Sequence, residues 1–73
     1  MDCQRLIQAF SQQEELTKFA LSNQCGLFGE VFMTLVDDAI KAGYLRVGAM
    51  DFDETGEEVP LTYVLTEKGK SLL

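Results

Sequence analysis

The chain has 73 residues, 47% of them hydrophobic, with five Phe, two Tyr and one Pro. Twelve Asp and Glu against six Lys and Arg give a formal net charge of −6 and a pI near 4.3. This composition excludes a disordered chain, and the length predicts one domain over residues 1–73. Because cations supply most of the non-specific attraction to phosphate, the acidic balance disfavours nucleic acid and membrane surfaces and favours a protein partner.

Reactive groups are scarce. Cys3 and Cys25 lie far apart and the chain has no His, so we expect reduced thiols, no metal and no cofactor. No P-loop, dinucleotide fingerprint or GxSxG motif occurs, and no imidazole is available as a general base, so we expect no enzyme. The first residues lack the pattern of a signal peptide, and no apolar run has the length of a membrane span, which predicts a cytoplasmic protein.

The first part of the chain predicts two short helices. An apolar stripe indicates a helix over residues 2–10; the stripe consists of Leu6, Ile7 and Phe10. The sequence SQQE at residues 11–14 matches a capping box, so we expect a second helix to begin there. Its expected inner face consists of Leu16, Phe19 and Ala20. The sequence NQCG at residues 23–26 predicts a turn closed by glycine.

The third helix has the strongest pattern in the chain, because apolar doublets recur every four residues from Leu27 to Ile40. Four residues advance 40° beyond a full turn, so the doublets spread over more than one face of the helix. Gly43 is placed to end this helix. One face of the helix is therefore too narrow to bury every apolar side chain.

After Gly43 the apolar period changes to two, which predicts an antiparallel hairpin of residues 44–49 and 61–65 with DETGEE at its tip. Thr66 is placed to cap a final helix over EKGKSLL, although Gly69 inside that segment disfavours a helix.

Residues 35–47 read LVDDAIKAGYLRV and residues 63–73 read YVLTEKGKSLL, with an acidic hairpin between them. This order resembles the core of MarR-type and PadR-type transcriptional regulators over about residues 12–73. The resemblance implies an α+β winged helix-turn-helix fold with three helices, a β-hairpin wing and a short C-terminal helix. It also implies that the third helix lies in the major groove of DNA and that a wing arginine reaches the backbone or minor groove.

At the positions that contact DNA in that family, this chain carries acidic and uncharged residues and no cation. The groove-facing positions carry Gly29, Glu30, Met33, Thr34 and Asp37, and the buried positions carry Phe32, Leu35, Val36 and Ala39. The wing carries only acids, namely Asp51, Asp53, Glu54, Glu57 and Glu58. With acids at both contact points, we expect the third helix not to read bases. The flanking helices by which longer MarR-type proteins dimerise have no counterpart here beyond a short helix at each end.

Two interpretations of the surplus apolar residues Leu27, Phe28, Val31 and Met33 remain open. They form an exposed patch for a partner or a second copy of the chain, or the first helix and the final SLL cover them. The wing acids likewise either keep a hairpin tip soluble or attract a basic surface, as a DNA mimic would. The sequence DFDETG resembles half of a calcium loop, and GLFG has the spacing of an RNA clamp, but each lacks its remaining ligands or cations.

The leading hypothesis is a small acidic winged-helix module that regulates through a protein with a basic surface. The predicted partner-binding residues are Phe28, Gly29, Glu30, Met33, Thr34, Asp37, Asp51, Asp53, Glu54, Glu57 and Glu58. The alternative is a DNA-binding regulator of the winged-helix type, as a monomer or a dimer, whose cations converge on one face after folding. The cations are Arg5, Lys18, Lys41, Arg46, Lys68 and Lys70. A third hypothesis is a unit that serves only in assembly or dimerisation.

Overall fold

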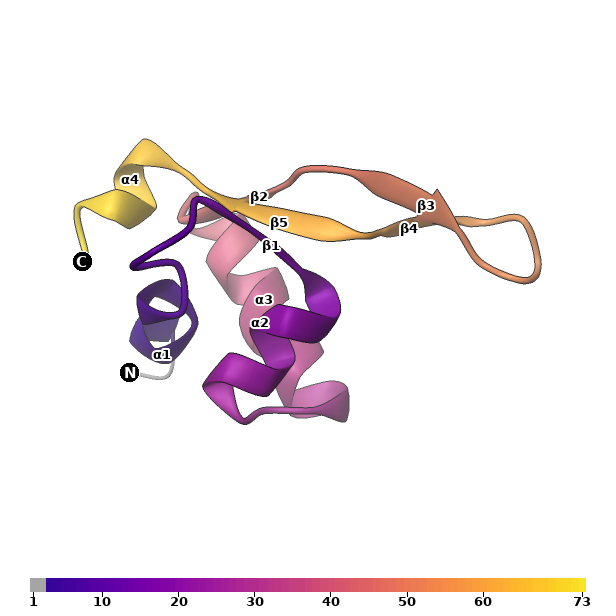
Figure 1. Ribbon diagram of the computed structural model, residues 1–73, viewed down its shortest axis with the longest axis horizontal. Coiled ribbons are helices and arrows are strands. Elements are labelled where there is room, and N and C mark those ends of the chain that lie inside the picture. Colours follow the sequence, from indigo (N-terminus) through magenta and orange to yellow (C-terminus); the bar gives the residue numbers. More distant parts are fainter. Residues whose placement is uncertain (1–2) are drawn as a thin grey trace.

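The structure is a computed structural model that describes residues 3–73. Its elements in chain order are α1 (Cys3–Gln8), β1 (Glu15–Thr17), α2 (Lys18–Cys25), α3 (Gly29–Lys41), β2 (Leu45–Val47), β3 (Met50–Phe52), β4 (Glu58–Pro60), β5 (Thr62–Leu65) and α4 (Glu67–Lys70). Figure 1 shows α1, α2 and α3 packed below a small sheet, from which the β3–β4 hairpin projects as a wing. This arrangement confirms the predicted α+β winged helix-turn-helix fold.

The small sheet has three antiparallel strands in the order β1-β5-β2. β5 is its central strand, with Leu16 of β1 and Val47 of β2 on either side of Tyr63. The hairpin pattern predicted β2 and β5, but β1 was not predicted, because its three residues form a strand only through pairing with β5, far along the chain. The second helix is therefore present, as α2, but its predicted start at residues 11–14 is wrong.

The capping box at residues 11–14 does not form. Glu14 instead uses its side chain to bind Lys70 at 2.8 Å and its carbonyl to accept a bond from the backbone N–H of Leu65. The N-cap of α2 is Thr17, whose hydroxyl oxygen accepts a hydrogen bond from the backbone N–H of Ala20 at 3.0 Å. The long-range strand pairing thus outweighs a local capping signal.

The later start of α2 also changes which of its side chains face the core. Leu21 and Cys25, four residues apart, are the buried residues of α2, whereas Phe19 is 79% exposed. The prediction that Phe19 lies on the inner face is therefore wrong. Leu16 is buried as predicted, but from β1 and not from a helix.

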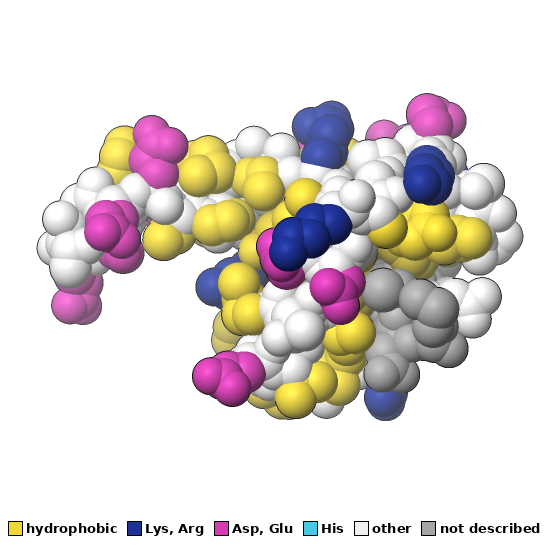
Figure 2. Space-filling model, turned by 180° about the vertical axis from the view of Figure 1, so that it is seen from behind, with side chains coloured by type: hydrophobic (Ala, Val, Ile, Leu, Met, Phe, Trp, Pro, Cys, Tyr) yellow, Lys and Arg dark blue, Asp and Glu magenta, His cyan; other side chains and the backbone are white. Residues whose placement is uncertain are grey.

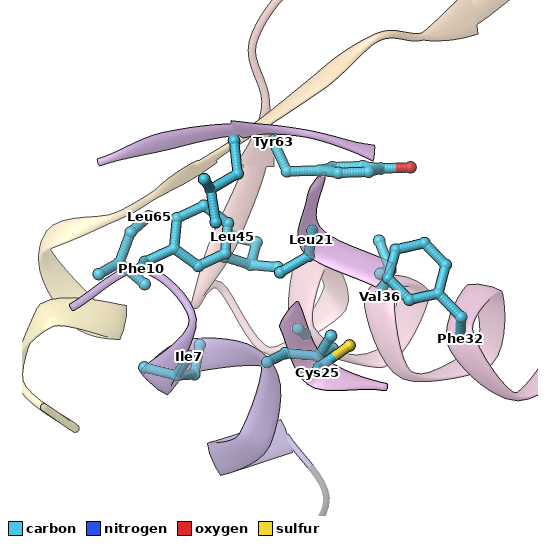
Figure 3. Packing of buried hydrophobic residues seen from close by; sticks show 12 residues of the cluster. Ile7, Phe10, Leu21, Cys25, Phe32, Val36, Leu45, Tyr63 and Leu65 are labelled. Carbon is cyan, nitrogen blue, oxygen red and sulfur yellow. The ribbon is translucent and has the colours of Figure 1, made fainter. Parts of the chain in front are cut away.

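The core lies between the sheet and the first three helices, as Figure 3 shows. Its buried members are Leu6, Ile7, Phe10, Leu16, Leu21, Cys25, Phe32, Val36, Ala39, Leu45, Tyr63 and Leu65. From α3 these include three of the four residues predicted to be buried, and the fourth, Leu35, is half-buried. Among residues 4–73 no polar or charged side chain is buried apart from the Tyr63 phenol, whose pKa is raised by burial. Cys25 lies in this core as a free thiol, while Cys3 belongs to the part whose side chains are not described.

Glycine ends α3 as predicted. Gly43 has φ of 87°, in the left-handed region that favours glycine, and its backbone N–H donates to the Ile40 carbonyl.

α4 begins at the predicted cap, because the Thr66 hydroxyl accepts from the Gly69 N–H at 3.1 Å. α4 covers only Glu67–Lys70, shorter than the segment EKGKSLL. Gly69 does not oppose this helix: a Cβ there would overlap the Tyr44 carbonyl oxygen, so glycine allows α4 to pack closely.

The wing is longer than the predicted hairpin tip. The N–H groups of Leu61 and Thr62 both donate to the Ala49 carbonyl, so two residues of one strand face one of the other, as in a β-bulge. Beyond this point β3 and β4 pair from Met50 opposite Pro60 to Phe52 opposite Glu58. The segment expected as a loop is therefore mostly paired, and only residues 53–57 form the tip.

Candidate binding site on helix α3 and the wing

The start of α3 exposes apolar side chains. Phe28 is the N-cap residue, makes no side-chain capping bond and is 62% exposed, while Val31 and Met33 are 59% and 40% exposed. Leu27 is half-buried against the core. Of the two interpretations left open by the sequence, the exposed patch is therefore correct for Phe28, Val31 and Met33 and incorrect for Leu27.

A groove of about 720 Å³ runs between α2, the start of α3 and the base of the wing. Its lining consists of Thr17, Lys18, Phe19, Ser22, Phe28, Gly29, Glu30, Phe32, Met33, Val59, Pro60 and Leu61. Most of these side chains are apolar; Phe19 is largely exposed in the groove and Leu61 is 43% exposed. The groove is formed by residues 17–22 and 28–33 together with residues 59–61, which come much later in the chain, so no local pattern indicated it.

The groove brings together only part of the predicted binding set. Phe28, Gly29, Glu30 and Met33 line it. Thr34 lies outside, in a smaller hollow beside Glu30, Val31 and Leu35. Asp37 is exposed farther along α3, where it binds Lys41, and none of the five wing acids lines the groove.

Sequence reasoning missed Phe19, Lys18 and the wing residues Val59, Pro60 and Leu61 as lining residues. Phe19 was missed because the helix was expected to begin too early, which turned this side chain inward. The sequence predicted Leu61 as the first residue of the second hairpin strand, but β5 begins at Thr62 and Leu61 lies at the bulge opposite Ala49. A β-bulge has no dependable signature in a single sequence, so only the folded backbone could reveal this part.

The wing tip is organised around Asp53. Its Oδ1 accepts hydrogen bonds from the Thr55 hydroxyl at 2.6 Å, the Thr55 N–H at 2.9 Å and the Glu57 N–H at 3.1 Å. These bonds, led by that from the Thr55 hydroxyl, hold the pKa of Asp53 below its ordinary value. Asp53 therefore orders the tip. The contact with a partner that the sequence predicted for Asp53 would be a second role, in addition to this structural one.

The resemblance to half of a calcium loop is not matched by the geometry. Within residues 3–73, no group of three or more His, Cys, Asp or Glu side chains is placed to hold a metal ion. The carboxylate of Asp53 is directed to backbone and hydroxyl donors of the tip itself.

Three of the six cations are held in contacts away from the groove. Lys41 binds Asp37 at 2.9 Å, which raises the pKa of Lys41. Lys70 binds Glu14 at 2.8 Å and Glu67 at 3.3 Å, and these bonds raise its pKa. Lys68 donates to the Ala42 carbonyl at 2.7 Å and lies 5.2 Å from the ring centre of Tyr44.

The wing has no cation of its own. Residues 47–66 contain no Lys or Arg, and in the described part of the chain no salt bridge involves any of the five wing acids. Figure 2 shows hydrophobic and acidic side chains along the projecting wing. Lys18 is the one cation in the lining of the groove. The face that α3 and the wing form together is therefore apolar and net negative.

Between Cys3 and the C-terminus no single helix is long and apolar enough to cross a bilayer. Within these residues, α2 and α3 together have the length and apolar composition of a membrane span, but their axes are bent by 106°.

Comparison with known proteins gives one fold assignment. No protein-family model matches the sequence, and no curated protein matches it. The solved structure of a MarR-family transcriptional regulator from Silicibacter pomeroyi superposes on 97% of this chain with a TM-score of 0.71 and 15% sequence identity. The chain covers 44% of that regulator, so it spans less than half of its length. The predicted resemblance is confirmed at the level of fold: the chain has a MarR-like winged helix-turn-helix fold.

Proposed function

We propose that the chain is a regulatory winged-helix module that acts through contact with another protein, made by the groove and the wing. The observation that carries this proposal is the apolar groove between α2, α3 and β4, beside a wing without cations. Exposed apolar surface with a polar rim is typical of protein interfaces. The role is one of binding in the cytoplasm and involves no catalysis or cofactor.

Electrostatics support a protein over DNA at this face. A protein gains affinity for DNA by neutralising phosphates with Lys and Arg. On the exposed side of α3, the side chains of Glu30, Asp37 and Asp38 are acidic, and Lys41 is bound to Asp37. The wing adds five carboxylates. An approach of this face to a phosphate backbone would therefore be opposed by like charge.

A DNA-binding regulator is the second candidate, and the fold itself favours it. The similar solved structure is described as a transcriptional regulator, and the start of α3 and the base of the wing line one groove in this chain. Arg5, Lys18, Arg46 and Lys68 form no salt bridge among residues 3–73, so they are the cations most available for DNA binding, although Lys68 donates to the Ala42 carbonyl. A homodimer would double their number.

Fluorescence anisotropy with a labelled mixed-sequence duplex, at low and at physiological salt, separates the two candidates. We expect no salt-sensitive binding for the wild type. Binding that weakens steeply as salt rises, and weakens again in Lys18→Gln and Arg46→Gln, would support the DNA-binding regulator and contradict the protein-binding proposal. Lys70→Gln serves as a control, because Lys70 is already occupied by two carboxylates. Sedimentation at several concentrations reports whether the chain is a dimer under the same conditions.

A further inference from the structure

We infer that the occupant of the groove is a segment of a partner protein in which large apolar side chains are flanked by Lys and Arg. This inference rests on the proposed function and specifies the chemistry of the partner. It follows from two properties of the same face, the apolar lining of the groove and the uncompensated acids beside it.

The apolar property sets what enters the groove. A volume of about 720 Å³ lies in the range of sites that enclose several apolar groups. Phe19, Phe28 and Leu61 line it with large exposed surfaces, and Met33 adds a flexible side chain that adapts to different shapes. Burying these surfaces under an apolar partner side chain removes them from water, which is the main source of affinity at such a contact.

The charge property sets what surrounds those apolar groups. β4 begins with Glu58, next to the lining residue Val59, and α3 contributes Glu30 to the lining itself. The wing acids are all exposed and take part in no salt bridge within residues 3–73. Lys18 is a single opposing charge, so the surroundings of the groove remain net negative. Charges of opposite sign on a partner would steer it to this face and fix its register.

The same charges argue against a second copy of the chain as the occupant. Two copies would each bring a formal charge of −6. Pairing through the groove would place one acidic wing near another, or near Glu30, and like charges across an interface suppress association. A partner segment with Lys and Arg removes this repulsion and pairs with acids that form no salt bridge within residues 3–73.

The test uses two dye-labelled synthetic peptides with the same pattern of Leu and Phe, one with Lys at the remaining positions and the other with Glu. Anisotropy is measured against the full chain at physiological salt. We expect the Lys peptide to bind and the Glu peptide not to bind. Phe28→Ser should weaken binding of the Lys peptide about tenfold, since a large apolar contact is lost. The double variant Glu57→Gln and Glu58→Gln should weaken it about threefold, because exposed charge pairs contribute little each.

Two matched variants control for unspecific effects. Leu73→Ser removes an exposed apolar side chain at the C-terminus, which lies at the opposite end of the molecule from the wing. Glu67→Gln removes an exposed acid of α4. Neither should change peptide binding. Circular dichroism confirms that each variant keeps the fold, as expected for exposed positions.

Each other outcome overturns the inference in a distinct way. Equal binding of both peptides, if Phe28→Ser weakens it, would show an apolar docking site without charge preference. This result would support the proposed function and contradict the inference that the partner carries Lys and Arg. Equal weakening by Glu67→Gln and by the wing variants would show attraction to overall charge only. Self-association that depends on Phe28 would identify a second copy as the occupant. Binding of neither peptide would reject the inference, and salt-sensitive duplex binding in addition would reject the proposed function.

Discussion

The body of the molecule and the face formed by α3 and the wing use similar residues in opposite ways. In the body, apolar side chains are buried and Lys70 joins the chain segments around Glu14 and Glu67. On the other face, apolar side chains are exposed, and within residues 3–73 Asp37 is the one acid of α3 and the wing that forms a salt bridge. Phe28 and Phe32 are four residues apart in the sequence, and their side chains are 62% and 2% exposed. The α3 region therefore buries Phe32 in the core and leaves Phe28 exposed in the groove, the surface proposed to bind a partner.

The sharpest test of this division compares the two phenylalanines. Phe32→Ala should lower the free energy of unfolding by about 3–5 kcal/mol, because a buried ring is replaced by a cavity. A loss of this size is a large part of the stability of a small domain. Phe28→Ala should change it by less than about 0.5 kcal/mol, since the ring is mostly in water. Urea unfolding followed by circular dichroism measures both values. Similar losses in the two variants would contradict the division.

A smaller effect distinguishes the observed start of α2 from the capping box in the sequence. Thr17→Ala removes the hydroxyl that accepts from the Ala20 N–H and should destabilise the fold by about 1 kcal/mol. Ser11→Ala should have almost no effect, because residues 11–14 do not begin a helix and Ser11 is exposed. The same unfolding experiment serves both variants, and a larger loss for Ser11→Ala than for Thr17→Ala would favour the earlier helix start.

The smallest expected effect concerns the wing tip and its dependence on pH. A pKa lowered in the folded state means that ionised Asp53 stabilises the tip. That stabilisation is complete above the ordinary pKa of Asp and is lost as the pH falls through the lowered pKa. The amide signals of Thr55 and Glu57 should therefore shift together in acid, with a midpoint below that of an unstructured Asp, and Asp53→Asn should abolish this shift. Nuclear magnetic resonance across the acidic range provides the measurement. A midpoint at or above the ordinary value would show that the tip does not depend on Asp53, and the core signals of the body should not follow the same titration.

The elements that the sequence predicted correctly are those whose signals lie within one segment. The doublets of α3 place Phe32, Val36 and Ala39 in the core, Gly43 ends the helix, and Thr66 caps α4. The hairpin and the winged-helix order follow from the change of apolar period and from the resemblance to MarR-type sequences. The predicted exposed positions Gly29, Glu30, Met33, Thr34 and Asp37 are all exposed, while their role in binding a partner remains a prediction.

The elements that the sequence misplaced depend on partners that are distant in the chain. Residues 15–17 form β1 because β5 offers hydrogen bonds, and this pairing delays α2 and turns Phe19 outward. Gly69 disfavours a helix by its intrinsic propensity, yet it is required where α4 approaches the Tyr44 carbonyl. Leu61 becomes part of the groove only because the ladder bulges at Ala49.

By itself, the sequence determined the winged-helix class, the apolar surplus of α3 and the acidic wing, because periodicity, composition and capping act over a few neighbouring residues. Only the tertiary structure decided where α2 begins, which phenylalanines meet water, and that α2, α3 and β4 enclose one groove. These features arise from strand pairing and from packing between distant segments. The free energies of these contacts exceed local conformational preferences, and no single stretch of the sequence carries a pattern that indicates them.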